Sequence, residues 1–127
     1  MSEGLGARKW AVPEGYIPEG SHGPEPDMVS HEAVCILNTS DSDASVRITL
    51  YFTDREPVGP YEVEVPARRT RHVRLNDLQD PEPVPRATEY ASVIASDIPI
   101  VVQHSRLDSR QAENALMTSL AFPVSGP

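Results

Sequence analysis

Cysteine and lysine are nearly absent from this 127-residue chain, which contains one of each, Cys35 and Lys9. A single cysteine cannot form a disulfide within the chain, which fits a reducing compartment. Because Cys35 lies in the apolar run 33–37, we interpret it as a buried small hydrophobe. Residues 1–10 lack the apolar stretch of a secretory signal, and no apolar run approaches the roughly 20 residues of a membrane span. We therefore expect a cytoplasmic location.

Sequence motifs that carry catalysis or bind phosphate are also missing. The chain contains no Gly-x-Ser-x-Gly, no P-loop and no His-Glu-x-x-His. His104 and Ser105 are adjacent, so on a strand they point to opposite faces and cannot act together as base and nucleophile. The spacing of the histidines does not require a metal, and the formal net charge of −8 makes nucleic acid an unlikely partner. We predict a protein that binds, without enzymatic activity, cofactor or metal.

Prolines are abundant instead, and the 13 of them fall mostly between apolar runs. Such punctuation indicates strands and turns, because proline interrupts helices. Alternating polar and apolar residues, clearest over 44–52 and 61–65, predict half-buried strands. The expected strands are 9–12, 31–38, 44–52, 61–65, 69–75, 90–96, 100–107 and 115–122, separated by proline-rich loops over 13–26 and 76–88 and a turn at 97–99. We expect one domain over 1–127, all-β, with seven or eight strands in a sandwich or barrel, a loose arm at 1–8 and a tail at 123–127.

The strand 100–107 and the residue after it form the most informative stretch. Ile100 and Val102 share a face with His104, Arg106 and Asp108, because alternate residues of a strand point the same way. An apolar start followed by this polar row predicts a strand that leaves the core and enters the wall of a polar pocket. The alternative is a solvated strand end in which Arg106 and Asp108 form a pair.

A basic stretch over 68–74 offers a second constellation. Arg69 and Arg71 share a face with Val73, which would place them at a pocket mouth. His72 and Arg74 would lie beside the glutamates of the strand 61–65, as opposite charges on neighbouring strands. The other interpretation is a site for an anion or an acidic partner.

A small-molecule pocket can be assembled from these residues and their neighbours. Glu32 and Asn38 share one face of the strand 31–38 and add an acceptor and an amide. Trp10 is either a core residue or a stacking surface for a sugar. The candidate ligand-binding residues are Trp10, Glu32, Asn38, Arg69, Arg71, His104, Arg106 and Asp108.

Long irregular blocks of the sequence resemble a known family, the soluble transducers of cyanobacterial sensory rhodopsins. The longest block is VQHSRLDSRQAEN over 102–114, and the resemblance extends from about Trp10 to Ala121. The other matching blocks are 14–18, 23–26, 30–32, 34–38, 56–61, 65–70 and 76–78.

The resemblance implies a β-sandwich of jelly-roll type, assembled as a homotetramer. It also implies binding to the cytoplasmic side of a sensory rhodopsin, a seven-helix retinal photoreceptor, and relay of its signal. The wider superfamily resembles small-molecule binding domains, with sugars as candidate ligands. Both faces of the strand 31–38 are apolar, so the strand is either central in a sandwich or covered by a partner subunit. Two functions remain open: a signalling adaptor, or a domain that binds a small polar ligand.

Overall fold

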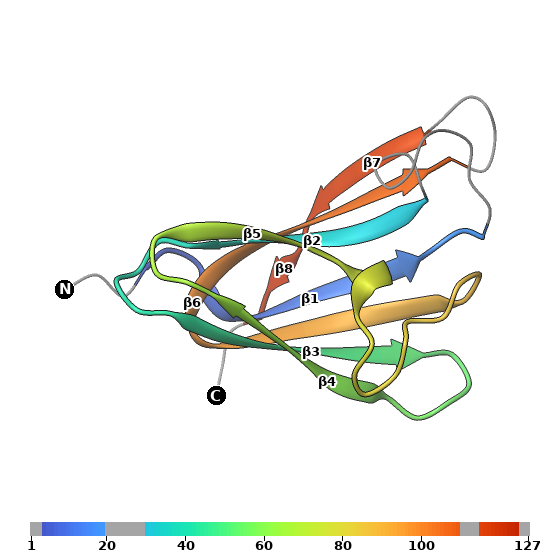
Figure 1. The fold of residues 1–127 in the computed structure, drawn as a ribbon, viewed down its shortest axis with the longest axis horizontal. Helices are drawn as coiled ribbons and strands as arrows, with labels where there is room; N and C mark the ends of the chain where they lie inside the picture. Colours follow the sequence, from blue (N-terminus) through green and yellow to red (C-terminus); the bar gives the residue numbers. More distant parts are fainter. Residues whose placement is uncertain (1–3, 20–29, 110–114, 125–127) are drawn as a thin grey trace.

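The computed structural model describes residues 4–19, 30–109 and 115–124. Among them are eight strands and one short 3-10 helix, η1 (Figure 1). The elements are β1 (Ala7–Tyr16), β2 (His31–Asn38), β3 (Ala44–Phe52), β4 (Val58–Val65), β5 (Arg69–Arg74), η1 (Leu75–Asp77), β6 (Glu89–Asp108), β7 (Ala115–Leu120) and β8 (Phe122–Pro123).

The strands form two antiparallel layers that share β6 (Figure 1). The first layer has the order β4-β3-β6-β1-β8, and the second contains β5, β2, the other half of β6, and β7. The chain moves between the layers several times, as it does in a jelly roll. The expected antiparallel β-sandwich is confirmed.

Alternation along the strands produces the core, as the sequence predicts. On β3, Val46, Ile48 and Leu50 are fully buried and belong to one core cluster with inward residues of β2 and β6. Val34 and Ile36 fill the inner side of β2. Cys35 points the other way and is only half-buried, so its interpretation as a buried core residue is wrong. Partial burial raises the pKa of its thiol, and a hydrogen bond with Ser105 opposes that rise.

The two strands predicted over 90–96 and 100–107 are one continuous strand of 20 residues. Its first part pairs with β1 and β3, and its second part pairs with β2 and β7. Pro99 lies where β6 passes from one layer to the other, so the predicted turn is a bend within a strand. Because of this bend, one strand contributes residues to both layers.

The N-terminal strand is longer than predicted. The expected loop from Pro13 is wrong up to Tyr16, because β1 continues to that residue. The register between β1 and β6 shifts between Val12 and Gly15, so Pro13 and Glu14 occupy an irregular stretch that needs no regular ladder bond.

The two chain ends also contribute strand residues. β1 begins at Ala7, within the expected arm, and Pro123 of the expected tail belongs to β8, which pairs with β1. Just before β1, Gly6 has a φ of +100°, and a Cβ there would lie 1.9 Å from the Ile100 carbonyl oxygen. The remaining predicted features at 1–3, 20–29, 110–114 and 125–127 lie outside the described residues.

Within the described ranges, we find no helix long and apolar enough to cross a membrane.

Candidate functional site

A buried carboxylate, that of Glu32, is the centre of a polar cluster between the two layers. Glu32 lies on β2 and is fully buried. The Tyr90 hydroxyl donates to Oε1 of Glu32 at 2.5 Å, and Nε of Arg106 donates to Oε2 at 2.5 Å. Nε2 of His104 lies 3.3 Å from the same Oε2. Because Tyr90 belongs to the first-layer part of β6, the cluster connects the two layers.

The bend in β6 and the β2–β6 register place these groups. Glu32 is the direct cross-strand partner of Arg106, and His104 lies two residues earlier on the same inner side. Arg106 also reaches the first layer, where its Nη2 lies 2.5 Å from Oε1 of Glu14 on β1. The Glu14 side chain is 59% exposed. One guanidinium therefore joins a buried carboxylate to a carboxylate at the surface.

The charge state of the cluster follows from its contacts. Burial alone would raise the pKa of Glu32, but hydrogen bonds with His104, Tyr90, Arg106 and the Tyr16 backbone outweigh burial and lower it. Burial and the negative charge of Glu32 raise the pKa of the Tyr90 phenol strongly. Burial would lower the pKa of Arg106, but its bonds to Glu14 and Glu32 raise it. The cluster therefore holds an ionised Glu32, a neutral phenol and a charged guanidinium.

The backbone around Glu32 is held by a buried amide. Oδ1 of Asn76, on η1, accepts from the Glu32 N–H at 3.2 Å, and its Nδ2 donates to the Ser30 carbonyl at 3.0 Å. The Ser109 N–H donates to Oγ of Ser30 at 2.8 Å. These bonds fix the start of β2 against the end of β6, and so fix where the Glu32 carboxylate lies.

An open hollow of about 350 Å³ borders the cluster, where β1 and β3 end and β6 begins. Glu14 and Tyr90 belong both to the cluster and to the wall of the hollow. Gly15 allows β1 to pass over the Tyr90 ring, because a Cβ there would lie 2.4 Å from a ring carbon. The hollow is lined by Pro13, Glu14, Gly15, Tyr51, Phe52, Thr53, Glu89, Tyr90 and Ala91.

Of the eight predicted ligand-binding residues, the structure brings three together: Glu32, His104 and Arg106. Asp108 lies on β6 with His104 and Arg106 and is half-buried at the end of that strand, opposite Ala115 on β7. The predicted change from apolar to polar residues along β6 is present. These side chains fill the space between the layers, and the open hollow lies beside them.

Asn38 serves a structural purpose at the opposite end of β2. It lies six residues from Glu32, about 20 Å along an extended strand. Its Nδ2 donates to the carbonyls of Ser42, Val65 and Pro66, and its Oδ1 accepts from Ser40.

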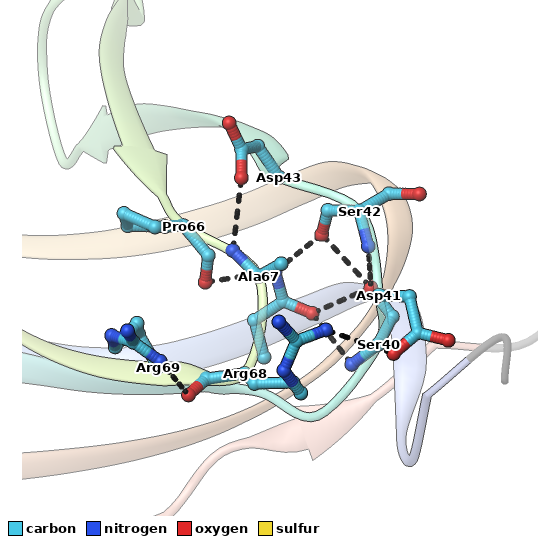
Figure 2. A network of polar contacts seen from close by, with 9 residues as sticks. Ser40, Asp41, Ser42, Asp43, Pro66, Ala67, Arg68 and Arg69 are labelled. Atoms are coloured by element: carbon cyan, nitrogen blue, oxygen red, sulfur yellow. Dashed lines mark hydrogen bonds and ion pairs between the residues drawn. The ribbon is translucent and has the colours of Figure 1, made fainter.

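Figure 2 shows the turns that Asn38 joins, at 39–43 and 66–68. Asp43 accepts from the Ala67 N–H, and Asp41 pairs with Arg68. Asn38 therefore holds two turns together and is not part of the site near Glu32.

Trp10 is a core residue, 7% exposed. Its Nε1 lies 3.0 Å from the Ala7 carbonyl oxygen and 2.9 Å from that of Ile100, so the indole N–H is shared between two backbone acceptors. Of the two interpretations of Trp10, the structure agrees with a core residue and not with a stacking surface, because a buried ring offers no face to a ligand.

The predicted pair of Arg69 and Arg71 is exposed on β5, near the Asn38 turn. Arg69 is the cross-strand partner of Asn38, and both arginines donate to backbone carbonyls, of Arg68 and Glu64. The eight predicted residues therefore do not line one pocket. The expected pairing of β5 with the glutamates of β4 is also wrong, because these strands belong to different layers and Glu62 lies opposite Arg47.

Sequence reasoning missed Glu14 and Tyr90. Glu14 follows Pro13 and precedes Gly15, so its surroundings indicate a loop. Tyr90 was included in a predicted strand, but its partner Glu32 is 58 residues away and no local pattern connects the two. Alternation would have placed Tyr90 on the inner side with Ile94, where a hydroxyl requires a buried partner.

The fold places the chain among the antiparallel β-sandwich proteins, here with a buried ion-pair cluster beside an open hollow. The chain belongs to the Anabaena sensory rhodopsin transducer family, whose family model matches residues 5–123. This match agrees with the resemblance seen in the sequence.

The solved structures that are similar to the chain include the following two. The Anabaena sensory rhodopsin transducer is 63% identical over 86% of this chain and 95% of its own, with a TM-score of 0.75. The crystal structure of Thermotoga maritima 1070 is 41% identical over 96% of this chain and 98% of its own, with a TM-score of 0.85. No curated protein matches.

Proposed function

We propose that this protein is a cytoplasmic, non-enzymatic signalling adaptor that binds a sensory rhodopsin and relays its light-activated state. The observation that carries the proposal is family membership. The family model matches 5–123, and the Anabaena transducer is 63% identical over nearly its whole length. The cluster around Glu32 offers a route for relay, because Arg106 links the surface Glu14 to a carboxylate between the layers.

Binding to the receptor is the decisive test. A sensory rhodopsin is reconstituted in nanodiscs and titrated with the protein by calorimetry, in the dark and under illumination. The adaptor function predicts saturable binding whose affinity differs between the two conditions. Absence of binding in both conditions contradicts it.

We also propose that the protein assembles as a homotetramer. On the outward side of β2, the apolar residues Ala33, Cys35 and Leu37 follow His31 in a row. Leu37 is 39% exposed and lies opposite the half-buried Val101. A second apolar patch lies at the β8 edge, where Phe122 is 64% exposed. Two separate apolar faces suit a tetramer of dihedral symmetry, which needs two different interfaces.

A second candidate function is binding of a small polar ligand such as a sugar, and the open hollow supports it. Its volume falls in the range of small-molecule sites, and its wall combines aromatic rings with carboxylates. A thermal-shift screen with sugars and polyols tests this function. We expect stabilisation by at least one compound, lost in Tyr51→Ala, and a screen without any stabilisation contradicts the proposal.

A further inference from the structure

Negative charge is left over at the hollow. Glu14 lines the hollow, and it shares the guanidinium of Arg106 with a second carboxylate, that of the buried Glu32. Glu89 adds another carboxylate to the wall, and it is exposed. Among the residues that the structure describes, none that lines the hollow is basic. The hollow is therefore complementary in charge to a cation.

An arginine already packs on one of the aromatic rings that line the hollow. The guanidinium carbon of Arg55 lies 4.8 Å from the centroid of the Phe52 ring, which is within the range of a cation–π contact. Nη2 of Arg55 lies 2.9 Å from Oε1 of Glu82, so the charge of Arg55 is already balanced and does not neutralise the hollow.

A second aromatic surface is available in the hollow. The Tyr51 side chain is one of the large exposed apolar groups of the described chain, at 46% exposure. It lies next to Phe52 in sequence and borders the same hollow as Glu89. A planar guanidinium can stack on a ring and donate two hydrogen bonds to one carboxylate, whereas an ammonium group cannot do both as well.

We propose that the hollow binds an arginine side chain of the receptor, with Glu89 as its ion-pair partner and Tyr51 as its stacking surface. The inference deepens the adaptor function proposed above and rests on it. It identifies the docking site of the adaptor and the chemistry of the partner at that site.

The source of the arginine follows from the partner class. Cytoplasmic segments of membrane proteins carry an excess of arginine and lysine. The formal net charge of −8 attracts such a surface at long range, and the hollow then supplies the short-range contact. The incoming guanidinium also contacts Glu14. Because Glu14 pairs with Arg106, and Arg106 pairs with Glu32, docking at the hollow affects the buried cluster.

The experiment compares three variants for binding to the rhodopsin in nanodiscs. Glu89→Gln and Tyr51→Ser each change an exposed side chain of the hollow. Glu62→Gln is the matched control, because it removes the same charge from an exposed glutamate of β4 in the same layer. Thermal melting establishes that all three fold like the wild type.

We expect Glu89→Gln and Tyr51→Ser each to weaken receptor binding at least about fivefold, and Glu62→Gln to change it less than about twofold. Added salt should weaken the wild type more than Glu89→Gln, because the ion pair is screened. Arginine-to-glutamine changes in the cytoplasmic segments of the receptor should remove the difference between wild type and Glu89→Gln.

The outcomes separate the two proposals. If the wild type binds the rhodopsin and both hollow variants bind equally well, the hollow is not the docking site and the adaptor function stands. If the wild type does not bind the rhodopsin, both proposals fail. A third outcome is that N-acetyl-arginine amide shifts the NMR signals of the hollow while Glu89→Gln leaves the affinity for the receptor unchanged. In that case the hollow is a site for small cations, and its assignment as the docking site for the receptor is overturned.

Discussion

The Tyr90 hydroxyl lies 2.5 Å from Oε1 of Glu32, so a tyrosine of one layer hydrogen-bonds a buried carboxylate of the other. The same carboxylate holds Arg106, which in turn holds Glu14 at the surface. The polar cluster therefore connects the two layers of the sandwich at one end. Each of its bonds is satisfied only in the folded arrangement, which makes the cluster sensitive to single substitutions.

Loss of the guanidinium should destabilise the fold strongly. Arg106→Met leaves the ionised Glu32 buried without its cationic partner, which costs about 3–5 kcal/mol in comparable cases. The measurement is urea unfolding followed by tryptophan fluorescence, since Trp10 is the single tryptophan. Arg55→Met is the control, because its pair with Glu82 is nearly half exposed and should contribute at most about 1 kcal/mol. Equal losses in the two variants would contradict the central role of Arg106.

Acid should remove part of this stability in a defined direction. The pKa of Glu32 is lower in the folded protein than its ordinary value of 4.5, so the folded state favours the carboxylate. The contribution is complete above about pH 4.5 and is lost as the pH falls through the folded pKa. Glu32→Gln cannot titrate at this position, so the difference in unfolding free energy between wild type and variant should shrink below pH 4.5. A constant difference down to pH 3 would show that Glu32 does not titrate as described.

The phenol itself can be tested by removing one oxygen atom. Tyr90→Phe takes a donor from a buried carboxylate, and we expect a loss of about 1–3 kcal/mol in unfolding free energy. Tyr61→Phe is the matched comparison, because its hydroxyl donates to the Glu82 carbonyl, an uncharged acceptor, at 2.7 Å. Its loss should be about 1 kcal/mol. A smaller effect at Tyr90 than at Tyr61 would mean that Glu32 finds another donor.

Much of this arrangement could be predicted from alternation within single strands. The inward residues of β3 and β4, and the shared face of His104 and Arg106, follow from period two alone. Alternation does not say which strands pair, because pairing depends on contacts between distant residues. The order of the strands in the sequence therefore suggests a pairing of β5 with β4, whereas β5 pairs with β2.

At Pro99 and Pro13, the local sequence predicts a turn and a loop, whereas the structure has strand at both positions. Proline lacks the N–H of a ladder bond, and both residues therefore indicate a break. In the fold, Pro99 lies at a bend where β6 changes layer, and Pro13 lies in the irregular register of β1. At both positions the strand ladder does not require a backbone N–H, so proline is tolerated there. Glu14 enters the site because of that irregular register, which the sequence pattern does not reveal.

The core role of Trp10 leads to a separate prediction. Trp10→Phe keeps a large apolar ring but removes the N–H shared by the Ala7 and Ile100 carbonyls. We expect a loss of about 1–3 kcal/mol in unfolding free energy, measured by circular dichroism in urea. Any binding measured for the wild type, to a receptor or to a small ligand, should remain unchanged at temperatures where the variant is folded. A selective loss of binding without a loss of stability would restore Trp10 as a binding residue.

The outward face of β2 should control assembly. Leu37→Glu places a charge among Cys35 and Val101 on that face, which prevents burial against a second copy at little cost to a single folded subunit. Size-exclusion chromatography with light scattering should show a tetramer for the wild type and a smaller species for Leu37→Glu. Arg47→Glu is the control, since it also adds negative charge to an exposed strand position, on the other layer. A wild type that is monomeric at micromolar concentration contradicts the tetramer. A Leu37→Glu variant that stays tetrameric assigns the interface to another face, of which the Phe122 edge is the next to test.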